Sequence, residues 1–218
     1  MADQMTSRFS RVLAIGAHTD DVELSCGATL SRMKRQGARV FVAALSRAEA
    51  SLPPGVPVDE LEREFRSAMA LLGADDLHVG GFPVRNLAEH RQAVLDELIT
   101  LRRRFEPDLV LTMNSADTHQ DHAVVHQESL RAFRGVTMLG YELPWNQRTS
   151  ANDIFVEVSP QDLERKVEMV AEYNTQAQLR RNYAAPEAVR AAAVFRGVQG
   201  RLPLAEMFEC ISVVWREL

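Results

Sequence analysis

The sequence predicts an α/β fold in which helices flank a mostly parallel sheet. The first observation behind this prediction is that short apolar runs, which suit buried strands, alternate with stretches of helix length. The second is that Gly37 and Gly73 follow two of these helical stretches, where a left-handed residue can end a helix. The third is that no repeat, low-complexity tract or linker divides the chain. Residues 1–218 are therefore expected to form a single domain.

The first half of the chain opens with a βαβ unit. The apolar run at residues 12–17 predicts a strand buried on both faces, residues 22–36 predict a helix, and residues 39–45 predict a second strand. Such a crossover between parallel strands is right-handed. A helix at residues 59–72 and a short strand at residues 77–79 continue the alternation.

The second half continues the same pattern. Its expected elements are a helix at residues 90–105, a strand at 109–112, a helix that ends near 133, and strands at 138–141, 155–158 and 211–215. Ser159 is a good N-cap, Pro160 suits the first helical position, and Asp162 places an acid in the first turn. A helix is therefore expected from there to about residue 173.

Composition disfavours several classes of protein. The net charge is −5 and the basic residues are spread along the chain, which disfavours a nucleic-acid partner. No run of about 18 apolar residues occurs, so no membrane span is expected. Cys26 and Cys210 form no metal-binding spacing and fit a reducing compartment. The first residues lack the apolar core of a signal peptide, and we expect a cytoplasmic protein.

Two polar clusters follow predicted buried strands, one near residues 18–23 and the other near residues 117–122. Sites in open α/β sheets form at the carboxyl ends of strands, so the two clusters are expected to meet in one crevice. Together they offer histidines and carboxylates. These are the ingredients of a metal site that also holds its own base.

The residue types suggest a catalytic zinc site. Such a site takes about three ligands from His and Asp or Glu and leaves one position for water. His18 and Asp21 are three residues apart at a strand-to-helix junction, and His122 could close the site from the other cluster. Asp20 would then remain beside the metal as a base.

The remaining side chains of the second cluster suit supporting roles. His119 lies one helical turn from His122 and could face a substrate carbonyl, with Asp121 fixing its tautomer or charge. Each motif alone has a structural alternative, since Asp20 or Asp21 could be a plain N-cap and the two histidines a solvated turn. The joint occurrence after two buried strands favours the metal site.

Other motif-based classes fit less well. His122 and His126 are four residues apart, but the glutamate of a His-Glu-x-x-His protease is missing between them. Glycine-rich phosphate and dinucleotide loops are also absent. A signalling receiver would need a lysine near its fifth strand, and the two lysines of the chain lie elsewhere.

The clusters resemble the two signatures of the LmbE/PIG-L deacetylases. Residues 17–23 (AHTDDVE) are similar to Ala-His-Pro-Asp-Asp-x-Glu, and residues 117–122 (DTHQDH) are similar to Asp-x-His-x-Asp-His. Weaker similarity extends over most of the chain, at residues 27–30, 45–46, 141–144, 173–176, 196–197 and 205–208.

The resemblance implies a Rossmann-like fold and one divalent metal, usually zinc, with Fe²⁺ as an alternative. By position, the family's metal ligands are His18, Asp21 and His122. Asp20 matches its general base. His119 matches the histidine that stabilises the oxyanion or protonates the leaving amine, and Asp121 the residue that orients it. Whether His119 or Asp20 delivers that proton is left open.

The chain departs from the family pattern at two positions. Thr19 stands where the family usually has proline, which should change loop stiffness more than chemistry. Many members carry an arginine three residues before a glutamate that matches Glu64, but that position here is Leu61. Arg85 could replace the missing arginine, and a plain surface role is the alternative.

The implied activity is hydrolysis of a linear amide C–N bond, which removes acetyl from a small N-acetylated sugar or glycoside. Tyr141, Glu142 and Trp145 could form a wall against a sugar, or pack as aromatic residues at a strand end. The alternative functions are an inactive sugar- or nucleotide-sugar-binding relative and a hydrolase of another small amide. A homo-oligomer also remains open.

Overall fold

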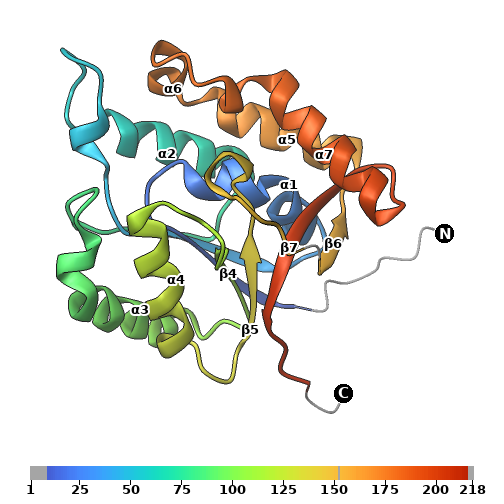
Figure 1. Ribbon diagram of the computed structural model, residues 1–218, viewed down its shortest axis with the longest axis horizontal. Coiled ribbons are helices and arrows are strands. Elements are labelled where there is room, and N and C mark those ends of the chain that lie inside the picture. The colour runs from blue at the N-terminus through green and yellow to red at the C-terminus, as the bar shows by residue number, and fades with distance from the viewer. Residues whose placement is uncertain (1–8, 152, 216–218) are drawn as a thin grey trace.

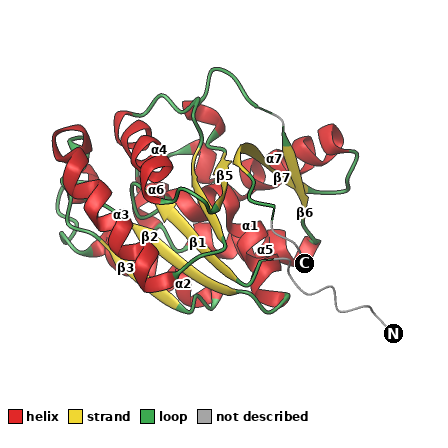
Figure 2. Cartoon of the chain, turned by 90° about the horizontal axis from the view of Figure 1, so that it is seen from below, coloured by secondary structure: helices red, strands yellow, loops and turns green. Residues whose placement is uncertain are grey.

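The strands form one mixed sheet in the computed structural model, which describes residues 9–151 and 153–215. Its strands are β1 (Arg11–Gly16), β2 (Arg39–Ala44), β3 (Asp76–Val79), β4 (Leu109–Met113), β5 (Thr137–Tyr141), β6 (Ile154–Glu157) and β7 (Ala205–Ser212). They lie in the order β3-β2-β1-β4-β5-β7-β6, and β1, β2 and β3 run side by side in Figure 2. The strands β1 to β5 are parallel, whereas β7 is antiparallel to both of its neighbours. The predicted α/β fold with a mostly parallel sheet is confirmed.

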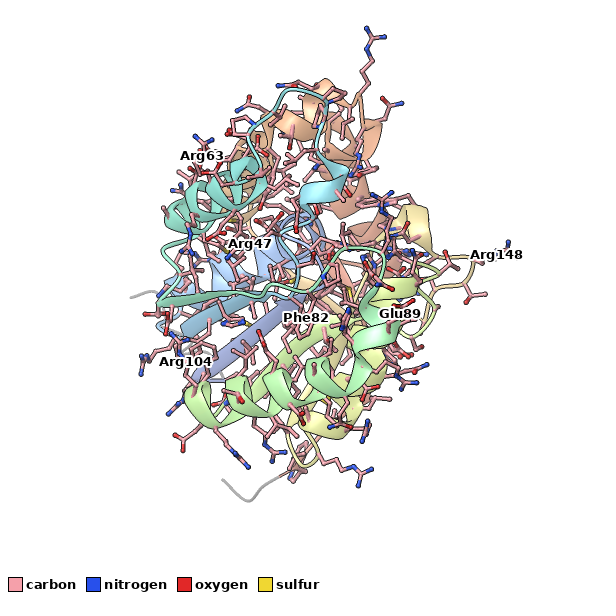
Figure 3. All side chains as sticks on the ribbon, turned by 90° about the vertical axis from the view of Figure 1, so that its left-hand side faces the viewer. Arg47, Arg63, Phe82, Glu89, Arg104 and Arg148 are labelled. Carbon is pink, nitrogen blue, oxygen red and sulfur yellow. The ribbon has the colours of Figure 1, made fainter. Side chains whose placement is uncertain are left out.

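Helices cover both faces of the sheet (Figure 1). One face carries α3 (Arg91–Phe105) and α4 (Gln120–Ala132), which pack against each other. The other carries α1 (Asp21–Arg35), α2 (Glu60–Leu72), α5 (Pro160–Ala171), the short α6 (Asn174–Gln178) and α7 (Pro186–Gly200). Figure 3 shows the two layers from the side, with Arg63 on α2 and Arg104 on α3 on opposite sides of the strands. No helix in the described ranges is long and apolar enough to cross a membrane.

The chemistry of the helix ends follows the sequence. Gly37 and Gly73 adopt left-handed backbone conformations, with φ of 89° and 69°, after α1 and α2. Ser159 caps α5 by accepting the Asp162 amide, and the Asp162 carboxylate accepts the Ser159 amide in return. This reciprocal pair satisfies two amides that the first turn of a helix leaves unpaired.

Two expectations for the C-terminal part of the chain were wrong. The last strand is β7, which begins at Ala205 rather than at residue 211. Its first four residues are buried, but Glu206 and Glu209 interrupt the apolar run, so the strand could not be recognised from the sequence. The helix α7 was not expected, since Val194 and Val198 are exposed and blur its amphipathic pattern. The extent of the predicted domain, residues 1–218, stays a prediction, because both of its ends lie outside the described residues.

A buried ion pair binds the backbone groups that a kink inside α1 leaves unpaired. The helix departs from helical geometry at Cys26, which frees backbone groups on both sides of the break. Lys166 donates to the Ser25 carbonyl at 2.9 Å, and the Glu206 carboxylate accepts the amides of residues 28 and 29 at 3.2 and 2.7 Å. Lys166 and Glu206 also pair with each other at 2.6 Å. The pair therefore fixes the helix that carries part of the first polar cluster to β7.

Replacing Glu206 by glutamine is expected to destabilise the fold by about 3–5 kcal/mol, because Lys166 would remain charged and buried without a counter-ion. The free energy of unfolding, measured by urea denaturation, tests this expectation. Glu157→Gln on the neighbouring strand β6 is the matched control, since Glu157 is exposed. A loss no larger in Glu206→Gln than in the control would contradict this role of the ion pair.

Candidate active site

The two polar clusters meet because their strands are neighbours. The strands β1 and β4 pair in parallel, so the segments after their carboxyl ends, near residues 17–21 and 114–122, lie at the same edge of the sheet. Gly16 is required at the turn after β1, since a Cβ atom there would lie 2.7 Å from the His18 carbonyl oxygen. The His18 amide then donates to the Asp21 carboxylate at 2.8 Å, which holds the loop closed.

Three buried side chains converge on one point, and we call them the central triangle: His18, Asp21 and His122. His122 Nε2 lies 3.3 Å from His18 Nδ1 and 3.4 Å from Asp21 Oδ1. His18 Nδ1 lies 3.4 Å from Asp21 Oδ2. Ligand atoms bound about 2.0–2.1 Å from a tetrahedral zinc lie about 3.3–3.4 Å from one another. The central triangle therefore offers an N, N, O donor set with spacings near those of three zinc ligands, the two N–O distances ending on different oxygens of Asp21.

Carboxylates behind the triangle orient both histidine rings. Asp121 Oδ2 lies 2.9 Å from His18 Nε2, and Asp117 Oδ2 lies 2.8 Å from His122 Nδ1. In each ring the other nitrogen faces the triangle. Carboxylates of this kind fix the tautomer and direction of metal-binding histidines.

The carboxylate of Asp121 does not lie where the sequence suggested. It was expected to orient His119, but it contacts His18 and accepts the backbone amides of Arg85 and Leu87 at 2.6 and 3.3 Å. The reason is that Asp121 lies in the first turn of α4, and its side chain points back toward the end of β1. Its backbone amide, in contrast, does contact the ring of His119.

Sequence reasoning did not assign a role to Asp117. The structure places its carboxylate on His122, and its other oxygen accepts the His119 amide at 2.9 Å. The only signal was its place at the start of the second signature. A loop residue has no periodic spacing that would indicate the direction of its side chain.

His119 lies beside the triangle and is a candidate for a fourth ligand, which would be the third nitrogen. One nitrogen from each of His18, His119 and His122 lies within 4.8 Å of the others. His119 Nδ1 accepts the Asp121 amide at 3.2 Å, so in this arrangement the ring proton resides on Nε2. Burial and the neighbouring histidines lower the pKa of His119 to about 4. His119 is thus a neutral ring with one N–H to donate.

The triangle attracts positive charge. Burial opposes a charged ring at His18 and His122, but nearby carboxylates, Asp21 foremost, outweigh it and raise the pKa of His18 to about 9 and that of His122 to about 10. Burial likewise opposes ionised Asp21, but the two histidines hold its pKa well below the usual range. A proton or a metal cation is therefore stabilised at this point.

Asp20 is free of the capping role that was the simplest alternative for it. It occupies the N-cap position of α1, but its side chain makes no capping hydrogen bond. Burial and the adjacent Asp21 raise the pKa of Asp20, while His18 and Arg181 oppose that rise. Its carboxyl group lines a pocket of about 430 Å³ together with the triangle and His119.

The pocket separates the four candidate substrate residues into two pairs. Arg85 and Trp145 line it. Tyr141 does not, because it is buried and its hydroxyl donates to the Ile15 carbonyl at 2.7 Å. Glu142 is also absent from the lining, because its carboxylate pairs with Arg196. The structure therefore places Tyr141 and Glu142 outside the pocket lining, and for Tyr141 it agrees with the alternative of packing at a strand end.

The departures from the family pattern also lie at the pocket. Thr19 and Leu61 both line it, so the position where many members carry an arginine faces the cavity here. Glu64 accepts the backbone amide of Thr175 at 2.9 Å and its hydroxyl at 2.5 Å. This anchors the segment 174–184 to α2.

A mostly parallel sheet with three histidines and several carboxylates beyond the ends of β1 and β4 places the chain in the class of LmbE-like deacetylase folds. Residues 13–133 match the family described as PIG-L, GlcNAc-PI de-N-acetylase. The chain belongs to this family.

Relatives agree with that assignment. The chain is 35 % identical over 145 residues to the uncharacterized deacetylase YaiS of Escherichia coli K12, and the match spans 61 % of this chain and 74 % of that protein. Family and relative together support an enzyme that hydrolyses N-acetyl amides.

Two solved structures share the fold at low sequence identity. The zinc-inhibited form of teicoplanin deacetylase Orf2 has a TM-score of 0.75 at 20 % identity, covering 91 % of this chain and 97 % of that one. GalB, the 4-carboxy-2-hydroxymuconate hydratase of Pseudomonas putida KT2440, has a TM-score of 0.78 at 20 % identity, covering 96 % and 99 %. Because the fold hosts both reactions, the function has to be argued from the site.

Proposed function

We propose that the chain is a zinc-dependent N-deacetylase that releases acetate from an N-acetylated sugar or glycoside. The observation that carries the proposal is the central triangle, whose N–N distance and two N–O distances, to the two oxygens of Asp21, are near the ligand spacing of a tetrahedral zinc. Family membership supports the same reaction class. Asp20, which a binding protein would not need, lines the pocket beside the triangle.

The ligands of the metal would be His18 Nδ1, His122 Nε2 and the Asp21 carboxylate. Nitrogen and oxygen donors of this kind suit zinc, and Fe²⁺ is the alternative metal. When bound there, zinc would supply Lewis acidity and lower the pKa of a water molecule toward about 7. Asp117 and Asp121 would keep the two rings aligned from behind.

Asp20 acts as the base in this proposal. It accepts a proton from the attacking water as the water oxygen bonds to the acetyl carbonyl carbon. His119 donates its Nε2 proton in a hydrogen bond to the carbonyl oxygen as negative charge develops there. The C–N bond then breaks, and acetate and the free amine leave.

The proton of the leaving amine is assigned to Asp20 rather than to His119. His119 Nδ1 accepts a backbone amide, so in this arrangement it cannot hold the second proton that a general acid would give away. Asp20 already carries the proton taken from water and can return it to the amine nitrogen. One carboxyl group thus serves both steps.

Acetate release tests the proposal. The zinc-loaded protein is incubated with N-acetylglucosamine, its phosphorylated and glycosidic derivatives and a simple acetamide, and free acetate is measured with an enzyme-coupled assay. Release from at least one sugar, well above that from the acetamide, is expected. Acetate release from none of them would remove the support for a sugar deacetylase.

Replacing Asp117 by asparagine is expected to weaken zinc binding by about 10–100-fold, because His122 loses the carboxylate that orients it. Competition with a chromogenic chelator measures the affinity. Asp96→Asn on the exposed face of α3 is the control. Equal affinity in both variants would contradict the role given to Asp117.

A further inference from the structure

Two arginines line the pocket, and their guanidinium groups are used differently. Arg85 is exposed, and its guanidinium donates to the Ala50 carbonyl at 2.8 Å. Arg181 is half-buried, and its guanidinium makes one hydrogen bond, to the Tyr183 hydroxyl at 2.8 Å. Among the described residues no carboxylate lies within 4.0 Å of it. Most of its five N–H donors are therefore unused beside an open cavity.

Other arginines of the fold have defined partners. Arg196 pairs with the buried Glu142 and Arg91 pairs with the buried Glu128, whereas the half-buried Arg32 and Arg102 donate to backbone carbonyls. Arginines without such surface point into solvent, as Arg148 does in Figure 3. Arg181 belongs to none of these groups, because it is half-buried, forms no ion pair within 4.0 Å among the described residues, and its guanidinium donates only to a hydroxyl group. A guanidinium in that position can bind an anionic group of a ligand.

Arg181 contacts an aromatic pair at the edge of the cavity. The ring of Tyr183 stacks on Trp145 with centroids 4.0 Å apart and planes 9° apart. Trp145 comes from the loop after β5 and Tyr183 from the segment after α6, so the stack joins two separate segments. The guanidinium carbon of Arg181 lies 5.9 Å from the centre of the Tyr183 ring. All three side chains line the pocket.

Positive charge in the pocket comes from the two arginines, of which Arg181 is the more buried. Leu61, which faces the same cavity, adds no charge. On the inner side, Asp21 would be engaged by the metal and Asp20 by the reacting water. A negative group on the substrate would thus find at Arg181 a positive charge that is shielded in part from solvent.

We propose that Arg181 binds a carboxylate or phosphate group of the substrate, so that the substrate class is an anionic N-acetylated sugar or glycoside. The planar guanidinium can donate two parallel hydrogen bonds to either oxyanion. Tyr183 acts as a positioning residue for it. The inference rests on the proposed deacetylase function, because it identifies the rest of the molecule whose acetamide reaches Asp20.

The test compares binding of anionic and neutral amine products, which need no turnover. Calorimetry on the zinc-loaded protein would use glucosamine, glucosamine 1-phosphate, glucosamine 6-phosphate and muramic acid, the last carrying a carboxylate. At least one anionic probe is expected to bind about tenfold or more tighter than glucosamine. The phosphate and carboxylate arms identify the oxyanion.

Variants assign the preference to Arg181. Arg181→Gln is expected to reduce it to about threefold or less, and Arg181→Lys to keep only part of it, because lysine lacks the planar fork. Arg180→Gln is the matched control, since Arg180 is adjacent, exposed and outside the pocket lining. With the N-acetyl forms, Arg181→Gln is expected to raise KM of the preferred anionic substrate more than KM of the neutral one. Thermal melts of all variants check that they fold.

The outcomes separate this inference from the proposed function. If acetate is released but neutral and anionic probes bind equally, or if Arg181→Gln behaves like Arg180→Gln, the anion site is overturned and the deacetylase stands. If the preference depends on Arg181 but no sugar is deacetylated, the anion site stands and the proposed reaction fails.

Discussion

Replacing Asp20 by asparagine is expected to lower kcat for acetate release by about 10²–10⁴-fold, the usual contribution of a positioned general base. Asparagine has nearly the same shape but can neither accept a proton from water nor return one to the amine. Because Asp20 is not one of the proposed ligands, zinc content is expected to stay unchanged. Acetate release at saturating substrate and elemental analysis of the same samples measure both effects.

The control for Asp20 is Asp59→Asn, at the exposed N-terminus of α2, where the aspartate also makes no capping hydrogen bond. It removes the same charge outside the pocket lining and is expected to retain full activity. Unchanged kcat in Asp20→Asn would sink the assignment of the base. Loss of zinc in that variant would indicate that Asp20 is a ligand.

Replacing His119 by alanine is expected to lower kcat by about 10²–10³-fold, the cost of removing one oxyanion donor. KM should change little, because the hydrogen bond strengthens only as charge develops on the carbonyl oxygen. Zinc content should not change, and this distinguishes the donor role from the alternative in which His119 joins the ligands. Steady-state kinetics and elemental analysis on the same preparation are required.

His126→Ala is the matched control, since His126 lies on the same helix and its ring contacts the Met113 carbonyl at 2.9 Å, outside the pocket lining. Its activity is expected to stay within about threefold of the parent protein. A zinc loss in His119→Ala but not in His126→Ala would reassign His119 as a ligand.

The parallel core of the fold was predictable because each of its strands has a recognisable apolar sequence of its own. Apart from Arg11 and Thr112, β1 and β4 consist of apolar residues and glycine, since both faces of a central parallel strand are covered by helices. β7 was not placed correctly, because the charge of Glu206 within it is matched by Lys166 on α5. A charge satisfied by a distant partner cannot be recognised from the strand alone.

The reactive centre was predictable for the same reason that the strands were. His18 and Asp21 follow β1, and His122 lies in the first turn of α4, the helix that follows β4. Because β1 and β4 are neighbours, the order of strands brings the three residues together. The direction of Asp121 was not predictable. It depends on how the start of α4 faces the loop after β1, which only the packed structure fixes.

The outer pocket wall was largely hidden in the sequence. Trp145 was noticed as an aromatic residue, but its partner Tyr183 lies in a segment with no periodic pattern. Arg181 carried no signal at all, because an arginine in a loop is usually solvated. Arg181 is proposed as an anion-binding residue because no carboxylate among the described residues pairs with it, and that depends on three-dimensional packing.

The proposed function requires that His18, Asp21 and His122 hold one metal ion, and elemental analysis of the purified protein measures this directly. We expect about one zinc per chain in the parent protein and a loss of the metal in His122→Ala. The structure of the variant, checked by circular dichroism, should be retained. A parent protein that binds no metal even when zinc is supplied at neutral pH would show that these three residues are not a zinc site.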